Sequence, residues 1–143
     1  MTLTLDAARS IVDTALRTAR AKKFQPLAVA VLDQRGKLKA FAAEDGTSLK
    51  RAEIATGKAH GALAMGLGSR TLGKMAAERP HFVAAVTHAV GGMLIPVAGG
   101  VLVRDGAGSV VGAVGISGDT SDNDEAAGVA GIAAVGLKAD PGA

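Results

Sequence analysis

The sequence predicts an α+β fold in which helices pack against an antiparallel sheet. Apolar residues recur at helical spacing near both ends of the chain. Strand-like segments between them are joined by short turns, and strands do not alternate strictly with helices as a parallel sheet requires. At 143 residues the chain is long enough for one domain, which we expect to span residues 1–143.

Helical spacing and capping residues place the expected helices. Thr4 can cap the first of them, and Ala8, Ile11, Val12 and Ala15 recur on one of its faces. Gly66 ends the second, and an acidic run at 119–125 leads into the last. The expected helical ranges are 4–22, 48–65, 69–76, 81–90 as a short helical or irregular piece, and a final helix to about residue 137.

Strands are expected where short apolar or alternating segments lie between turn residues. A turn at 33–36 joins the first two, and the loop Asp105-Gly106-Ala107-Gly108 joins the last two. In the second strand Leu38, Ala40 and Ala42 are expected on one face. The expected ranges are 27–32, 37–43, 93–97, 101–104 and 110–117, and residues 139–143 are expected to form a loose tail.

Composition excludes several classes of function. The net charge is +3, and the basic residues are scattered without aromatic residues between them, so nucleic-acid binding is not expected. The absence of Cys excludes disulfides, thiolate metal sites and a Cys nucleophile. The uncharged stretch 82–103 is interrupted by glycines and Pro96, so we expect no membrane span. No signal peptide is visible, and a cytoplasmic location is the expectation.

An acidic cluster before the last helix is the most unusual motif. Asp119, Asp122, Asp124 and Glu125 exceed what capping and the helix dipole require, so they could supply a cation site or a general base. The alternative is a purely structural role at the helix start. The preceding turn at Ser117-Gly118 offers backbone N–H groups that could hold a carboxylate or carbonyl.

The second helix carries the cationic candidates. Arg51 and Lys58 lie two turns apart on one face, whereas His60 lies on another face. Lys58 could bind a carboxylate or serve as an acid or base if desolvated; the alternative is a solvated surface. Gly99 and Gly100 could let a ligand approach the backbone, or could form a bulge.

The histidines do not have the spacing of a zinc site, and no metal ligand set is predicted. His81 and His88 are seven residues apart, and His60 is distant from both in sequence. Any one of the three could still bind haem iron or carry protons, or could be an ordinary surface or core residue.

Five segments of the chain resemble the GlcG/HbpS-like family. They are "LTLDAA", "VAVLDQRGKL", "KAHGAL", "PVAGGVLVRD" and "GAVGISGDTSDNDEAAGVAGI". The resemblance implies a profilin-like α+β fold with a five-stranded antiparallel sheet, flanking helices, and assembly into homodimers or larger homo-oligomers. The family includes haem-binding proteins, a glycolate-operon protein, the C-terminal domain of a corrinoid adenosyltransferase, and hydrolases that remove halogen from 5-halo-2-hydroxymuconates.

Three functions follow as hypotheses from these motifs and the resemblance. The first is a dehalogenating hydrolase that acts on a small unsaturated organic acid, such as a halogenated 2-hydroxymuconate. Arg51 and Lys58 would hold the acid, and Asp119, Asp124 or Glu125 would activate water. In it, the remaining pocket residues are His60, Gly99, Gly100, Ser117 and Gly118. The second is a haem-binding or haem-sensing protein: related haem binders carry a His in or just after the first helix, a region that here has none, which leaves His60, His81 or His88. The third is a non-catalytic accessory subunit that docks through glycine-thin helix faces.

Overall fold

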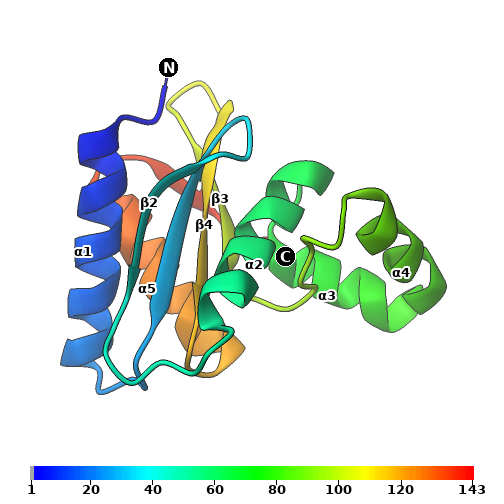
Figure 1. The fold of residues 1–143 in the computed structure, drawn as a ribbon. Helices are drawn as coiled ribbons and strands as arrows, with labels where there is room; N and C mark the ends of the chain where they lie inside the picture. The colour runs from blue at the N-terminus through cyan, green and yellow to red at the C-terminus, as the bar shows by residue number, and fades with distance from the viewer. Residues whose placement is uncertain (1) are drawn as a thin grey trace.

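The computed structural model describes residues 2–143, and its elements follow in the order helix, two strands, three helices, two strands, helix and strand (Figure 1). The helices are α1 (Leu5–Ala21), α2 (Arg51–Met65), α3 (Ser69–Glu78), α4 (Pro80–Ala89) and α5 (Ser121–Ala134). The strands are β1 (Ala28–Asp33), β2 (Leu38–Ala43), β3 (Gly100–Arg104), β4 (Val110–Ser117) and β5 (Lys138–Asp140).

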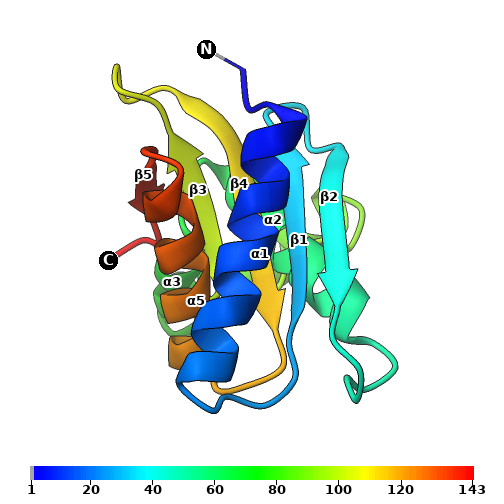
Figure 2. The same ribbon diagram turned by 90° about the vertical axis from the view of Figure 1, so that its left-hand side faces the viewer.

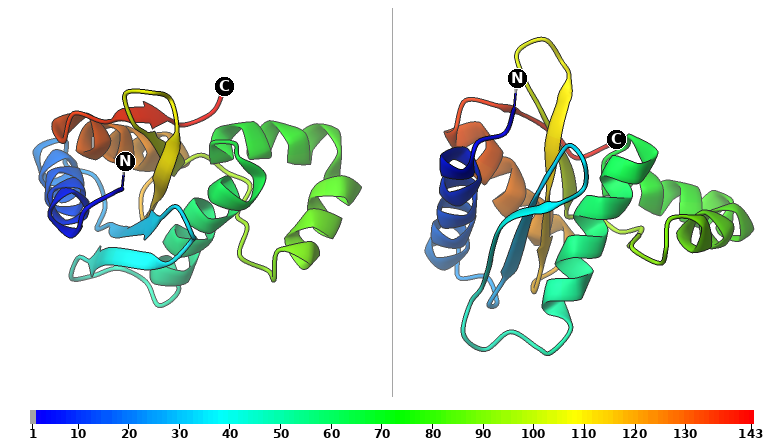
Figure 3. Two further views of the ribbon diagram at one scale, coloured as in Figure 1. Left: turned by 90° about the horizontal axis from the view of Figure 1, so that it is seen from above. Right: turned by 45° about the horizontal axis from the view of Figure 1, so that its top comes forward.

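The strands form one five-stranded antiparallel sheet in the order β2-β1-β4-β3-β5. Helices α1 and α5 cover one face of this sheet, and α2 crosses the other (Figures 1 and 2). Helices α3 and α4 extend away from the sheet beyond α2 (Figure 3). The predicted α+β fold with a five-stranded antiparallel sheet is therefore confirmed.

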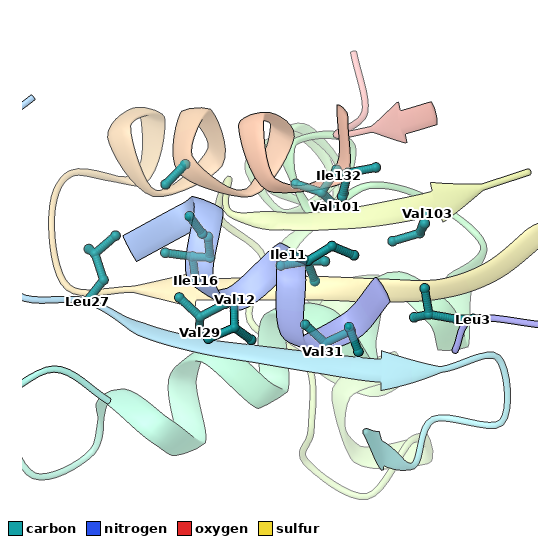
Figure 4. Close-up of a cluster of buried hydrophobic side chains, with 14 of the residues drawn as sticks. Leu3, Ile11, Val12, Leu27, Val29, Val31, Val101, Val103, Ile116 and Ile132 are labelled. Atoms are coloured by element: carbon teal, nitrogen blue, oxygen red, sulfur yellow. The ribbon is translucent and has the colours of Figure 1, made fainter. Parts of the chain in front are cut away.

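The main core lies between the sheet and the α1–α5 layer (Figure 4). Thr4 caps α1 as expected, because its hydroxyl oxygen accepts a hydrogen bond from the Ala7 N–H at 3.1 Å. Ile11 and Val12 of α1 pack with Val29 of β1 and with other apolar side chains that are nearly all fully buried. Burial of such aliphatic side chains supplies the main stabilisation, at roughly 1.5–3 kcal/mol each.

Glycines set the distance between α2 and the sheet. Gly100 of β3 and Gly115 of β4 are register partners, and the α2 backbone lies directly over them. A Cβ at Gly115 would lie 1.8 Å from the Ala55 carbonyl oxygen, and a Cβ at Gly100 would lie 2.3 Å from that of Lys58. Only glycine at both positions lets the helix approach this closely.

Two sequence-based strand assignments need correction. Residues 93–97 were expected to form a strand, but they form an irregular segment between α4 and β3. The tail expected at 139–143 instead includes β5, which pairs with β3 through Leu102 and Asp140. The fifth strand is thus the C-terminal one, and its three residues are too few to show an alternating pattern.

A bulge in β2 corrects the expected alternation of that strand. Val31 pairs with Ala40 but Leu32 pairs with Leu38, so the register shifts between them. Because partners across a sheet share a face, Leu38 lies on the α2 side together with Phe41, whose partner is Ala30. Leu38 is therefore not on the face of Ala40 and Ala42, which pack toward α1.

Two glycines of the last helix, α5, are buried inside the protein. Gly128 packs against Ile116 and Val101 of the sheet, and Gly131 packs against Ile11 of α1. In the described part of the chain, no helix combines the length and the apolar character needed to cross a bilayer.

Candidate functional site

Lys58 and Asp124 form a buried ion pair between α2 and α5. The Lys58 Nζ lies 3.0 Å from Asp124 Oδ2 and donates a second hydrogen bond to the Ile116 carbonyl oxygen at 2.8 Å. The two side chains are only 3% and 2% exposed. The other Asp124 oxygen accepts a hydrogen bond from the Asp119 N–H, so the carboxylate is held from two sides.

Burial moves both pKa values toward the neutral forms. Desolvation lowers the pKa of Lys58, and the charge of Asp124 opposes this shift. Desolvation likewise raises the pKa of Asp124, with Lys58 acting in the opposite direction. Such a pair fits a general acid and base when a substrate can reach it, and here it lies beneath the surface of the protomer.

The space beside the Gly99-Gly100 pair is filled by Lys58 rather than by open solvent. A Cβ at Gly99 would lie 2.8 Å from the Lys58 Nζ, and this glycine has a φ of +119° that disfavours other residues. Both glycines are buried. They make room for the lysine side chain to reach Ile116 and Asp124.

Asp119 organises the turn between β4 and α5. Its Oδ1 accepts a hydrogen bond from the Gln25 N–H at 2.6 Å, and its Oδ2 accepts from the Asn123 side chain and the Thr120 N–H, both at 2.7 Å. These hydrogen bonds, that of Gln25 first, lower the pKa of Asp119. Gly118, with φ +150°, packs against the Pro26 carbonyl oxygen. Thr120 is the N-cap of α5, and its hydroxyl oxygen accepts a hydrogen bond from the Asn123 N–H.

Glu125 and Asp122 both bind Arg70 of α3. Arg70 Nε lies 2.9 Å from Glu125 Oε1, and its Nη2 contacts Glu125 Oε2 and Asp122. These hydrogen bonds, that of Glu125 first, raise the pKa of Arg70. Sequence reasoning missed Arg70 because nothing local to α3 indicates a partner 55 residues away.

Arg51 contacts Ser117 across the end of the sheet. Its Nη1 donates to the Ser117 hydroxyl at 3.0 Å, and its Nε donates to Ser48 at 3.1 Å. Ser117 itself is fully buried. Arg51 thus lies near one end of β4, and the buried lysine lies further along α2 on the same side.

A cleft of about 440 Å³ lies at the start of α5. Arg70 and Lys74 of α3 form one wall, the segment Pro96–Ala98 forms another, and Ser121 and Asp122 form the third. The predicted substrate-binding residues Arg51 and Lys58 belong to α2. No α2 residue lines this cleft.

His60 lies on the outer face of α2, away from Lys58. Its Nδ1 is 2.9 Å from the Met93 carbonyl oxygen. A carbonyl oxygen only accepts, so this contact is a hydrogen bond when Nδ1 carries the proton, which leaves the lone pair on Nε2. The Nε2 lies by the turn at Gly36, in a depression of about 160 Å³ that Gln34, Arg35, Leu63 and Ala64 also line.

An apolar groove adjoins His60 along the same helix. It has a volume of about 290 Å³ between α2 and β2 and is lined by Leu38, Phe41, Ala52, Glu53, Thr56 and Met93. Thr56 lies one turn before His60 on α2, and Met93 lines the groove while its carbonyl holds the imidazole. Leu38 is 60% exposed and Phe41 39%, which is unusual for large apolar side chains grouped at one place.

The structure thus divides the predicted site residues into two groups. Lys58, Asp124, Gly99, Gly100, Asp119 and Gly118 gather around the junction of α2, β4 and α5, with Arg51 and Ser117 beside them and Glu125 on Arg70. His60 stands apart from this group: it lines the depression at Gly36, and its imidazole contacts Met93, which lines the apolar groove. His81 and His88 are exposed on α4.

Comparison with known proteins adds a family and several solved structures. The family described as "Haem degrading protein HbpS-like" matches residues 3–133. The PduOC–haem complex is similar at a TM-score of 0.85 and 22% identity, covering 96% of this chain and 97% of PduOC. HbpS is similar at a TM-score of 0.80 and 28% identity, covering 94% and 90%. The protein ORFY of Klebsiella pneumoniae is similar at 0.83 and 21%, covering 93% and 90%. No curated protein matches the chain significantly.

Proposed function

The chain belongs to the HbpS-like family of haem-degrading proteins. From this premise we propose that it binds haem on α2, across the apolar groove and the adjoining depression at Gly36, with His60 as the iron ligand. The observation that carries the proposal is the contact of His60 Nδ1 with the Met93 carbonyl oxygen at the end of that groove. A histidine that ligates a metal usually donates its other ring N–H to an oxygen acceptor of this kind.

The donor set and the groove fit a haem group in chemical character. Phe41, Leu38 and the side chain of Met93 offer apolar surface for a flat macrocycle. Lys37 and Lys39 lie on or beside the strand that forms one wall, where cations can meet the carboxylates of haem. A haem held there by His60 would supply an iron suited to binding small ligands and to redox chemistry.

Other histidines are less suited to the role. His81 and His88 project from α4, which is at the far end of the molecule from the sheet (Figures 1 and 3). Neither lines any of the cavities described above. They serve as matched controls because they share the chemistry of His60 without the groove.

The test is a titration of the purified protein with haemin, followed by the Soret band. We expect the wild type to saturate near one haem per protomer. The His60→Gly variant should bind haem at least about tenfold more weakly. Added imidazole should restore the wild-type spectrum of that variant, whereas His81→Gly and His88→Gly should titrate like the wild type. A wild-type protein without a Soret shift, or a His60→Gly variant that titrates normally, would overturn the proposal.

The comparisons do not support the dehalogenating hydrolase suggested by the sequence. Its candidate residues Lys58, Asp119, Asp124 and Glu125 all have protein partners in the protomer. A small unsaturated organic acid therefore has no support as the substrate, and haem is the better-supported ligand. Homo-oligomerisation remains part of the proposal, since the groove is open on one side.

A further inference from the structure

We infer that two copies of this chain pair through the open edge of β2, in antiparallel register about a two-fold axis at Phe41. The pairing would join two five-stranded sheets into one and place the two apolar grooves side by side. The surface consists of the outer edge of β2 with its flanking residues Lys37 and Asp45.

The first step concerns the backbone groups at this edge. β2 is the terminal strand of the sheet, so one of its sides has no neighbour among residues 2–143. The Glu44 N–H donates to the Leu27 carbonyl oxygen at 2.9 Å. Hydrogen-bonded and non-hydrogen-bonded pairs alternate along an antiparallel ladder. The backbone N–H and C=O groups of Ala42 and Ala40 therefore face β1, while those of Phe41 and Ala43 face outward. An outward row of this kind is a template for another strand.

The second step concerns charge. β2 is flanked by basic residues before it, including Lys37, and by acidic residues after it, including Asp45. Both of these side chains are exposed. Lys37 precedes β2 and Asp45 follows it, so antiparallel self-pairing brings the basic end of each strand beside the acidic end of its partner. Parallel pairing would instead bring like charges together, which is unfavourable.

The lysines also explain why this edge would not pair indiscriminately. Charged residues on an edge strand commonly protect it against aggregation. Here the lysines disfavour pairing with a strand unless that strand places acidic residues near them. They therefore select a partner strand with acids in the right place rather than prevent all pairing. A second copy of the same chain supplies the acids in the required order.

The third step concerns the apolar surface. Leu38 and Phe41 face the α2 side of the sheet and are large side chains left exposed in the protomer. Residues opposite each other in an antiparallel pair point to the same face. The two copies of Phe41 would therefore meet at the axis, and each would extend the groove of the other.

The pairing stands independently of haem binding, whereas its role as a second wall of the groove rests on the proposed function. The experiments on pairing use no haem. A failure of pairing and a failure of haem binding are thus observed separately.

Light scattering during size-exclusion chromatography provides the first test, against a monomer mass of 14.1 kDa. We expect an assembly containing the dimer, which Ala43→Pro dissociates because proline removes an outward N–H without removing a bond to β1. Lys37→Glu and Asp45→Lys should each weaken the dimer at least about tenfold, and the double swap should restore it. Thermal unfolding monitored by circular dichroism confirms that each variant is folded.

A cross-link provides the second test, and it holds even if a proline variant misfolds. The chain has no Cys, so Phe41→Cys introduces one thiol per protomer. Under mild oxidation we expect a disulfide-linked dimer, because Cα atoms paired across strands lie within disulfide range at about 5.5 Å. The control Ala84→Cys, exposed on α4, should stay largely unlinked. A monomeric wild type, or a Phe41→Cys variant that cross-links no faster than the control, overturns the inference.

Discussion

Lys58 and Asp124 meet at 3.0 Å in the interior although they belong to helices on opposite sides of the sheet. The lysine passes the buried Gly99-Gly100 pair to reach the start of α5. The contact ties together α2, the end of β4 through Ile116, and α5. Its removal should therefore affect the stability of the fold.

Lys58→Met should lower the free energy of unfolding by about 3–5 kcal/mol, because it leaves the Asp124 carboxylate buried without a compensating charge. Asp124→Asn should also destabilise the protein. The double variant should lose less than the sum of the two single losses, since it leaves neither charge unpaired. Urea unfolding of all four proteins measures the coupling. Strict additivity would show that the two groups do not stabilise each other.

Gly115→Ala should be strongly destabilising. The added Cβ would lie 1.8 Å from the Ala55 carbonyl oxygen, so α2 would have to move away from the sheet. We expect a loss of at least about 1–3 kcal/mol. Gly106→Ala is the matched control, because a Cβ at that position meets nothing within 4 Å. Its unfolding free energy should stay within about 0.5 kcal/mol of the wild type, and equal effects of the two substitutions would contradict the packing described for Gly115.

Asp119→Ala should destabilise the protein in a pH-dependent way. The folded state lowers the pKa of Asp119 below its ordinary 3.8 through its hydrogen bonds, that from Gln25 first. The contribution of the Asp119 carboxylate to the free energy of unfolding is therefore fully present above the pKa of the unfolded state. It is lost as the pH falls through the lower pKa of the folded state. We expect the free energy of unfolding of the Asp119→Ala variant to be about 1 kcal/mol lower than that of the wild type at pH 6.

That difference should shrink as the pH is lowered below 4, and urea unfolding at a series of pH values measures it. Asp13→Ala, which removes an exposed carboxylate of α1, serves as the control and should show no comparable change. A loss for Asp119→Ala that stays constant across the series would refute the pKa argument.

Thr56→Phe should weaken haem binding without unfolding the protein. Thr56 lines the apolar groove next to Phe41 and Met93 and is half-buried, so a larger side chain occupies the space proposed for the macrocycle. We expect at least about a tenfold loss of affinity, equivalent to 1.4 kcal/mol. Haemin titration measures the affinity, with Ala84→Phe on α4 as a control of equal bulk. Unchanged affinity in Thr56→Phe would place haem elsewhere on the protein.

The sequence was a good guide to elements that have a repeating pattern or a recognisable cap. The α1 periodicity and its Thr4 cap were confirmed, as was the strand at Val110–Ser117. The expectation that Lys58 and His60 lie on different faces of α2 was confirmed as well, since one is buried and the other contacts Met93. These features depend on neighbours within a few residues, and local pattern therefore reveals them.

Contacts between distant segments could not be predicted in the same way. The pairing of Arg70 with Glu125, and of His60 with Met93, joins residues far apart in the chain. The irregular segment at 93–97 has the apolar residues of a strand, but Gly57 and Gly61 of α2 let it pack on the helix instead. Tertiary packing overrode local preference at this position.

By itself, the sequence determined the α+β architecture, the helix and most strand positions, and the resemblance to the family, because these follow from periodicity and local motifs. Only the tertiary structure decided which ionisable groups are buried together and which lie beside a groove. The physical reason is that burial and pairing depend on the distance between segments. That distance is set here by glycines that let α2 approach the sheet, and by a bulge that turns Leu38 toward Phe41.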